Sequence, residues 1–140
     1  MAVTKDSISD RMKRQYEDRT RYLLPRRTYT ILRLDGVGFH QYTAGLASPF
    51  DDLFMKAMDM TAVTLCRETQ GAQFAFVQSD EISILLTDFA TINTDAWFDG
   101  NIQKIASVSA ANATFRFGLY RTHQVGGAHR ALFDCRVFTI

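Results

Sequence analysis

Arg33-Leu-Asp-Gly-Val-Gly-Phe-His40 is the stretch that decides how the rest of the chain is arranged. It overlaps a run of apolar and β-branched residues at 28–34, which predicts a β-strand. Alternation along this strand places Leu32 and Leu34 on one face and Asp35 on the other. The glycines that follow Asp35 allow the backbone to approach a ligand closely. The sequence therefore predicts a carboxylate at the end of a strand, beside a turn suited to ligand binding.

A second acidic element, Gln78-Ser-Asp-Glu81, separates two short strand-like runs at 72–77 and 82–87. Two such runs joined by a short polar segment predict an antiparallel hairpin with Asp80 at its tip. If this hairpin pairs with the first strand, Asp35 and Asp80 lie side by side.

Two helices are predicted to cover the sheet. Ser48 is a candidate N-cap, with Pro49 at the first helical position and Asp51 completing a capping-box variant, and Gly71 closes this helix. Thr94 is the candidate N-cap of the second. Its expected buried stripe is Phe98, Ile102, Ile105, Ser109 and Ala113.

The remaining segments complete the pattern. Residues 7–22 predict a basic surface helix that ends at Pro25, with residues 7–27 forming helix and linker. Residues 117–131 contain three glycines and are interpreted as a mobile loop, and residues 132–140 predict a last strand. The order after the first helix is β-α-β-β-α-β, so we expect an α+β, ferredoxin-like domain with a four-stranded antiparallel sheet and two covering helices.

Composition agrees with one globular domain over residues 1–140, with 46% hydrophobic and 22% charged residues. Basic residues dominate positions 10–27, and residues 100–133 contain no acid, so basic segments flank an acidic centre. Only two cysteines occur, which predicts a reducing, cytoplasmic setting. No apolar run is long enough to span a membrane, and the polar residues 1–10 are neither signal peptide nor anchor.

Asp35 and Asp80 are the candidate ligands of two Mg²⁺ ions, together with a backbone carbonyl. Such a pair of ions supports phosphoryl or nucleotidyl transfer, and magnesium leaves coordination positions free for water and phosphate oxygens. Backbone amides of residues 36–40 are candidates for holding a triphosphate. A turn acid such as Asp80 is also a common hairpin former, so the pair alone does not decide the function.

Three segments, Arg33-Leu-Asp-Gly-Val-Gly-Phe-His40, Gln78-Ser-Asp-Glu-Ile-Ser83 and Phe133-Asp-Cys-Arg-Val-Phe138, resemble the ordered signature segments of the tRNA-histidine guanylyltransferase superfamily. Residues 9–13 and 90–104 are more similar to its bacterial and phage branch of 3′-to-5′ polymerases. The similarity covers residues 7–140. It implies a polymerase-like palm domain that adds nucleotides, GTP preferred, to the 5′ end of tRNA after activation with ATP or GTP.

The resemblance also implies roles for individual residues. Asp35 and Asp80 would be catalytic and would hold both metal ions, with the Gly36 carbonyl on one of them. The implied nucleotide-binding residues are Gly36, Val37, Gly38, Phe39, His40, Ser79 and Lys104. Glu81 follows the family pattern, and we interpret it as a supporting residue rather than a ligand. Strand alternation, rather than the resemblance, places Arg33 on the face of Asp35, where it would support the site by pairing with the carboxylates or by contacting an anionic substrate.

Other interpretations remain open from the sequence. A phosphate contact by Lys104 competes with a solvated helix face, and Phe74, Phe76, Phe115 and Phe117 are most simply core residues. Val37 stands where the family usually has Arg or Lys, and the family continues beyond Ile140 into further helices. One rival of the same class is a cyclase-like palm that acts on free nucleotides, since diguanylate cyclases share the architecture, but the tRNA-family motifs argue against it. The rival of a different class is a catalytically idle palm that binds nucleotide or RNA, or assembles with full-length subunits. Self-association into a homo-oligomer is also expected, from the half-covered sheet and from the multimers of the family.

Overall fold

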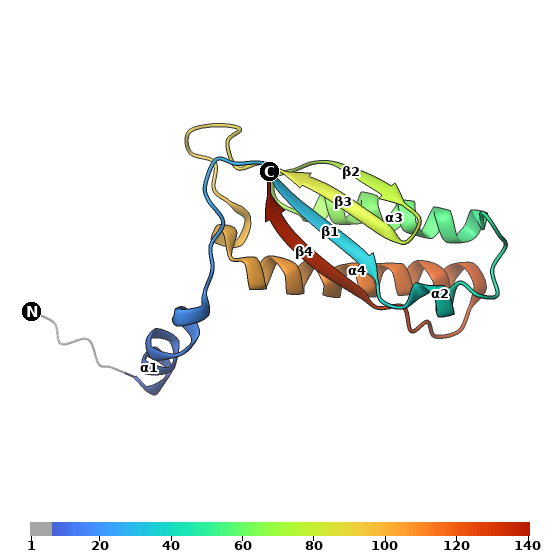
Figure 1. Cartoon of the computed structure of the whole chain (residues 1–140), viewed down its shortest axis with the longest axis horizontal. Helices are drawn as coiled ribbons and strands as arrows, with labels where there is room; N and C mark the ends of the chain where they lie inside the picture. Colours follow the sequence, from blue (N-terminus) through green and yellow to red (C-terminus); the bar gives the residue numbers. More distant parts are fainter. Residues whose placement is uncertain (1–6) are drawn as a thin grey trace, which may run out of the picture.

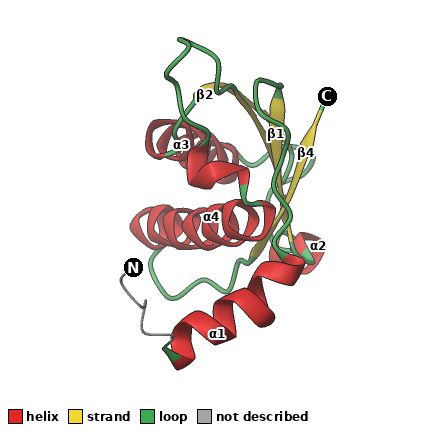
Figure 2. Ribbon diagram, turned by 90° about the vertical axis from the view of Figure 1, so that its left-hand side faces the viewer, coloured by secondary structure: helices red, strands yellow, loops and turns green. Residues whose placement is uncertain are grey.

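The computed structural model describes residues 7–140 and contains a four-stranded antiparallel sheet with two long helices on one face (Figures 1 and 2). The strands are β1 (Thr30–Gly36), β2 (Ala72–Gln78), β3 (Glu81–Leu86) and β4 (Phe133–Thr139), in the spatial order β2-β3-β1-β4. The covering helices are α3 (Asp52–Glu68) and α4 (Ile102–Val125). This confirms the predicted α+β class and ferredoxin-like order. The first six residues of the predicted polar N-terminal segment lie outside the described residues.

The sheet register follows the alternation expected from the sequence. Leu32 and Leu34 of β1 are fully buried beneath the helices, whereas Asp35 points to the opposite, open face. Asp35 is the direct partner of Glu81 on β3 and of Asp134 on β4. The end of β1 is therefore bordered by carboxylates on both sides.

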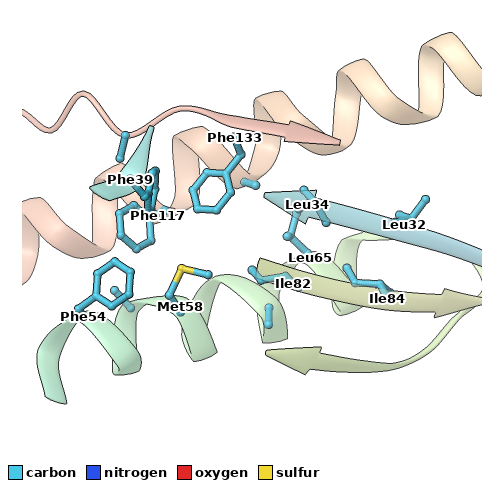
Figure 3. Packing of buried hydrophobic residues seen from close by; sticks show 14 of the residues in the cluster. Leu32, Leu34, Phe39, Phe54, Met58, Leu65, Ile82, Ile84, Phe117 and Phe133 are labelled. Atoms are coloured by element: carbon cyan, nitrogen blue, oxygen red, sulfur yellow. The ribbon is translucent and has the colours of Figure 1, made fainter. Parts of the chain in front are cut away.

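The hydrophobic core lies between the sheet and the two helices (Figure 3). Its sheet side is formed by Leu32, Leu34, Ile82 and Ile84, and its helix side by Met58, Leu65, Ile105 and Phe117, all at most 2% exposed. At the end of β1 the core becomes aromatic. Phe39, Phe54, Phe117 and Phe133 pack around one another there, next to Met58.

The N-terminal segment forms α1 (Ile8–Gln15) and the 3₁₀ helix η1 (Glu17–Thr20), on the far left of Figure 1. Ser7 caps α1 in a reciprocal capping box with Asp10. All residues of α1 and η1 are exposed, as expected for a surface helix. The chain joins the body where the Leu24 amide donates to the Gly100 carbonyl at 2.9 Å.

Both covering helices begin later than predicted. Asp51, rather than Ser48, caps α3, because its side chain accepts from the Phe54 amide at 2.9 Å. Asn101, rather than Thr94, caps α4 through the Lys104 amide at 3.2 Å. Thr94 instead accepts from the Thr91 amide in the preceding loop.

The predicted loop over residues 117–131 is wrong for most of its length. Residues 117–125 are the last turns of α4, because Phe117 is fully buried in the core and Gly118 is tolerated within the helix. Only residues 126–132 form a connection without regular structure. Phe74, Phe76 and Phe115 are also not core residues, since they are 60%, 59% and 58% exposed. In the described part of the chain, no helix combines the length and apolar character that crossing a membrane requires.

Candidate nucleotide and metal site

The turn that follows β1 is fixed to both neighbouring strands. The Gly36 amide donates to the Asp80 carbonyl at 3.1 Å, and the Val37 amide donates to the Leu132 carbonyl at 2.8 Å. The turn thus lies between the tip of the β2–β3 hairpin and the start of β4. Asp35 and Asp80 come together as the sequence predicts.

Phe39 anchors the far side of the turn, at the start of the short helix α2 (Phe39–Tyr42). Its ring is 3% exposed, with centroid distances of 5.1 Å to Phe133 and 5.6 Å to Phe117. The ring also covers Gly36 so closely that a Cβ atom there would lie 2.4 Å from Phe39 Cγ. Gly38, with φ of +63°, then reverses the chain into α2. The first glycine is therefore required by packing and the second by backbone conformation.

A buried polar chain holds the other end of α2. Arg121, 4% exposed, donates from Nε to the Tyr42 hydroxyl at 3.0 Å. The Tyr42 hydroxyl also forms a hydrogen bond with His129 Nδ1 at 2.9 Å, and His129 Nε2 donates to the Gly126 carbonyl at 2.8 Å. His129 is thus part of the support of α2, rather than a mobile surface residue.

Between the turn and the hairpin tip lies a cavity of about 410 Å³. Its walls are formed by Asp35, Gly36, Gly38, Phe39, His40, Thr43, Phe54, Ser79 and Asp80. Ser79 has φ of +56°, an uncommon value for a residue other than glycine, and lies at the tip of the hairpin next to Asp80. The cavity thus brings together two predicted catalytic carboxylates and most of the predicted nucleotide-binding residues.

The electrostatics of this cavity favour a cation. Burial raises the pKa of Asp35 above its ordinary value, and the neighbouring carboxylates of Asp80, Asp134 and Glu81 raise it further. The guanidinium of Arg136, whose Nη1 is 3.9 Å from Asp35 Oδ2, opposes this shift. Negative charge is therefore only partly compensated at the end of β1.

Asp134 and Arg136 were not predicted as site residues. Asp134 is the direct partner of Asp35, and its Oδ1 atom is buried with no hydrogen-bond partner among residues 7–140. Arg136 Nη1 is 3.9 Å from that atom, beyond hydrogen-bond distance. The signal was present in the sequence, because alternation along the strand at 133–139 places both side chains on the face of Asp35.

The other predicted residues are placed as follows. Arg33 Nη2 forms an ion pair with Glu81 Oε1 at 2.7 Å, on the open face beside the carboxylates. Val37 is 52% exposed and does not line the cavity, and its amide is occupied by Leu132. Lys104 lies in the first turn of α4, with Nζ 4.8 Å from the Phe98 ring centroid, and does not line the cavity either.

A second cavity of about 680 Å³ adjoins the first. The two share Thr43, Phe54 and Ser79, and the second extends between the 43–51 segment and α3 toward Met58. Together they have the size and mixed polarity of small-ligand sites.

Comparison with known proteins identifies the family and related folds. Residues 9–140 match the model of the tRNAHis guanylyltransferase family. The chain belongs to that family. A bacterial tRNA(His) guanylyltransferase-like protein solved in complex with GTP is 43% identical, with a TM-score of 0.91 over 96% of this chain and 64% of its own. The corresponding structure in complex with ATP has the same identity and TM-score over 96% and 59%.

A probable tRNA(His) guanylyltransferase from Dictyostelium discoideum is 29% identical over 109 residues, 76% of this chain and 40% of its own length. The chain therefore spans less than two thirds of the length of these relatives.

Proposed function

We propose that this tRNAHis guanylyltransferase family member is a magnesium-dependent nucleotidyltransferase that adds nucleotides, GTP preferred, to the 5′ end of tRNA. The observation behind the proposal is that Asp35 and Asp80 line one cavity with the turn at residues 36–40. Addition proceeds in the 3′-to-5′ direction. The 3′ hydroxyl of the incoming nucleotide attacks a 5′ phosphate that ATP or GTP has activated, so that a new phosphodiester bond forms and the activating group is released.

The residues present fit magnesium. Asp35, Asp80 and the Gly36 carbonyl are hard oxygen donors, and the crowding of carboxylates around Asp35 leaves charge for a divalent cation to neutralise. Among residues 7–140, no three His, Cys, Asp or Glu side chains are grouped to hold a metal by themselves. Magnesium is commonly held by one or two carboxylates plus substrate phosphates. When bound, two Mg²⁺ ions would activate the attacking hydroxyl and neutralise the triphosphate.

The chain's own residues bind and orient the nucleotide. The triphosphate lies along Gly36, Gly38, Phe39 and His40, and Ser79 contacts it from the hairpin tip. The base occupies the adjoining cavity, whose walls include Phe54 and Met58. The buried anchor of Phe39 keeps this turn in place before the nucleotide arrives.

Residues on the open face support the carboxylates. Glu81 is held by Arg33 at 2.7 Å and therefore acts as a charge-balanced neighbour of Asp35. Arg136 is near both Asp35 and Asp134 and limits their repulsion in the absence of a cation. We propose tRNA, GTP and ATP as partners of this site.

The second candidate function is a catalytically idle palm that binds nucleotide or RNA or assembles with longer subunits. It is favoured by Val37, which does not line the cavity and provides no cation, and by the position of Lys104 outside the cavity. In that case Asp35 and Asp80 still bind a nucleotide, but no transfer follows.

The test is incubation of the chain with Mg²⁺, labelled GTP and a tRNA lacking its first 5′ nucleotide. The proposal predicts a product longer by one or more nucleotides at the 5′ end, lost in both Asp35→Ala and Asp80→Ala. The charge-matched control is Asp95→Ala, because the Asp95 side chain is 89% exposed and lies outside both cavities. GTP binding without product at any protein concentration would instead support the idle palm.

A further inference from the structure

The open face of the sheet is ordered into three rows, each formed by directly paired residues of all four strands. The acidic row, next to the cavity, consists of Gln78, Glu81, Asp35 and Asp134. The arginine row consists of Phe76, Ser83, Arg33 and Arg136. The apolar row consists of Phe74, Leu85, Ile31 and Phe138. Consecutive rows are about 6.6 Å apart along the strands.

Aromatic rings on this face are accessible. Phe74 and Phe76 are 60% and 59% exposed, and Phe138 is 38% exposed. Two neighbouring phenylalanines on one strand, both on the side away from the helices, contribute nothing to the core. An exposed ring on an open sheet is a surface on which an unpaired base can stack.

The arginine row, which includes Phe76, lies between the apolar row, which includes Phe74 and Phe138, and the acidic row. Arg136 is 66% exposed and its nearest carboxylate oxygens are 3.9 Å away, while Arg33 is 46% exposed and paired with Glu81. Guanidinium groups beside exposed rings can pair with the phosphates that accompany stacked bases. The apolar row with Phe74, the arginine row with Phe76 and the acidic row thus follow one another toward the cavity.

We propose that the open face binds single-stranded RNA. Bases stack on Phe74 and Phe76, phosphates contact Arg33 and Arg136, and the end of the strand reaches the acidic row, where bound cations offset its charge. The inference rests on the proposed nucleotidyl transfer to RNA and adds the surface that presents the acceptor strand. A contact between two copies fits less well, because interface cores are depleted of charged residues and this face carries charge in two of its three rows.

Fluorescence anisotropy of a labelled, unstructured ten-nucleotide RNA tests the inference, in low salt with Mg²⁺. The double variant Phe74→Ala/Phe76→Ala is expected to bind at least about tenfold more weakly than the unmodified chain. Phe115→Ala is the matched control, because Phe115 is 58% exposed but lies on α4. Circular dichroism establishes that all variants are folded, which is expected because the truncated rings are exposed.

Arg33→Gln provides a second readout. Removing one phosphate contact is expected to lower the slope of log affinity against log salt by about 0.7. Unchanged RNA affinity in the Phe74/Phe76 double variant, or no RNA binding by the unmodified chain, would overturn the inference. The inference would also be overturned if sedimentation shows that the unmodified chain is a dimer, and the double variant loses the dimer but keeps the same RNA affinity.

The inference and the proposed function fail separately. If RNA binding depends on Phe74 and Phe76 but GTP is never transferred, only the proposed function is wrong. If nucleotide transfer depends on Asp35 but RNA affinity is unchanged in the Phe74→Ala/Phe76→Ala variant, only the inference of an RNA-binding face is wrong.

Discussion

Replacing Gly36 with alanine is expected to destabilise the protein by overpacking the site. The new Cβ atom would lie 2.4–2.7 Å from three atoms of the Phe39 ring, well inside van der Waals contact. The ring has nowhere to move, because it is 3% exposed and packed against Phe54, Phe117 and Phe133. Overpacking of this kind typically costs about 1–3 kcal/mol of unfolding free energy.

Urea denaturation followed by circular dichroism measures this cost. With a slope of about 2 kcal/mol per molar urea, a loss of 2 kcal/mol moves the midpoint by about 1 M. Gly45→Ala is the control, because a Cβ atom there meets nothing within 4 Å, and its midpoint is expected to stay the same or rise slightly.

A double-mutant cycle tests the cause. In a Phe39→Ala background the ring is gone, so Gly36→Ala is expected to cost almost nothing further. If Gly36→Ala lowers the unfolding free energy by the same amount with and without the Phe39 ring, contact with that ring is not the cause. A Gly36→Ala protein as stable as the parent would also refute the packing argument.

Three further changes test the supports of the fold. Asp88→Asn removes a carboxylate that accepts from Arg26 Nε at 3.0 Å and the Arg27 amide at 2.8 Å, with an expected loss of about 1–3 kcal/mol at pH 7. Burial opposes ionisation of Asp88, yet these bonds hold its pKa below the ordinary value. The stabilisation is therefore complete above about pH 4 and disappears as the pH falls through the folded-state pKa. A stability loss in Asp88→Asn that grows in acid would contradict this. Tyr42→Phe leaves Arg121 Nε without its acceptor and is expected to cost about 1–3 kcal/mol in the same urea assay, whereas an unchanged midpoint would argue against the buried polar chain. Gly118→Ala, within α4 and without a neighbour inside 4 Å, is expected to raise stability by about 0.5–1 kcal/mol, and a lowered midpoint would contradict the open space around it.

The sheet and its order could be predicted from the sequence because strand alternation is a local property. Leu32, Leu34 and Asp35 occupy the faces that alternation predicts, and the hairpin tip brings Asp80 into the same cavity as Asp35. The order of elements then fixes which strands are neighbours. The pair of carboxylates could therefore be predicted without tertiary information.

The helix boundaries could not be predicted from the sequence, because they depend on contacts with residues outside the helices' own segments. In the 3₁₀ helix η2 (Trp97–Gly100), Phe98 and Asp99 have positive φ values, which nothing in their local sequence indicates. Because of this kink, α4 begins only at Ile102, with Asn101 as its N-cap. At the other end, burial of Phe117 keeps the chain helical through Gly118, which suggests a loop when read alone.

The exposure of phenylalanines also depends on tertiary structure. Phe74 and Phe76 follow the same alternation as buried residues, but β2 turns them to the face that no helix covers. Asp134 and Arg136 were overlooked for a related reason, since their importance comes from pairing with β1 rather than from their own segment.

Calorimetric titration of GTP in the presence of Mg²⁺ tests whether Asp35 and Asp80 form one site for a divalent cation and a triphosphate. We expect magnesium-dependent binding by the unmodified chain and by Asp95→Ala. We expect loss of that binding in Asp35→Ala and equally in Asp80→Ala, because each carboxylate is one of two in the same cavity. Undiminished, magnesium-dependent GTP binding in either variant would contradict a shared site.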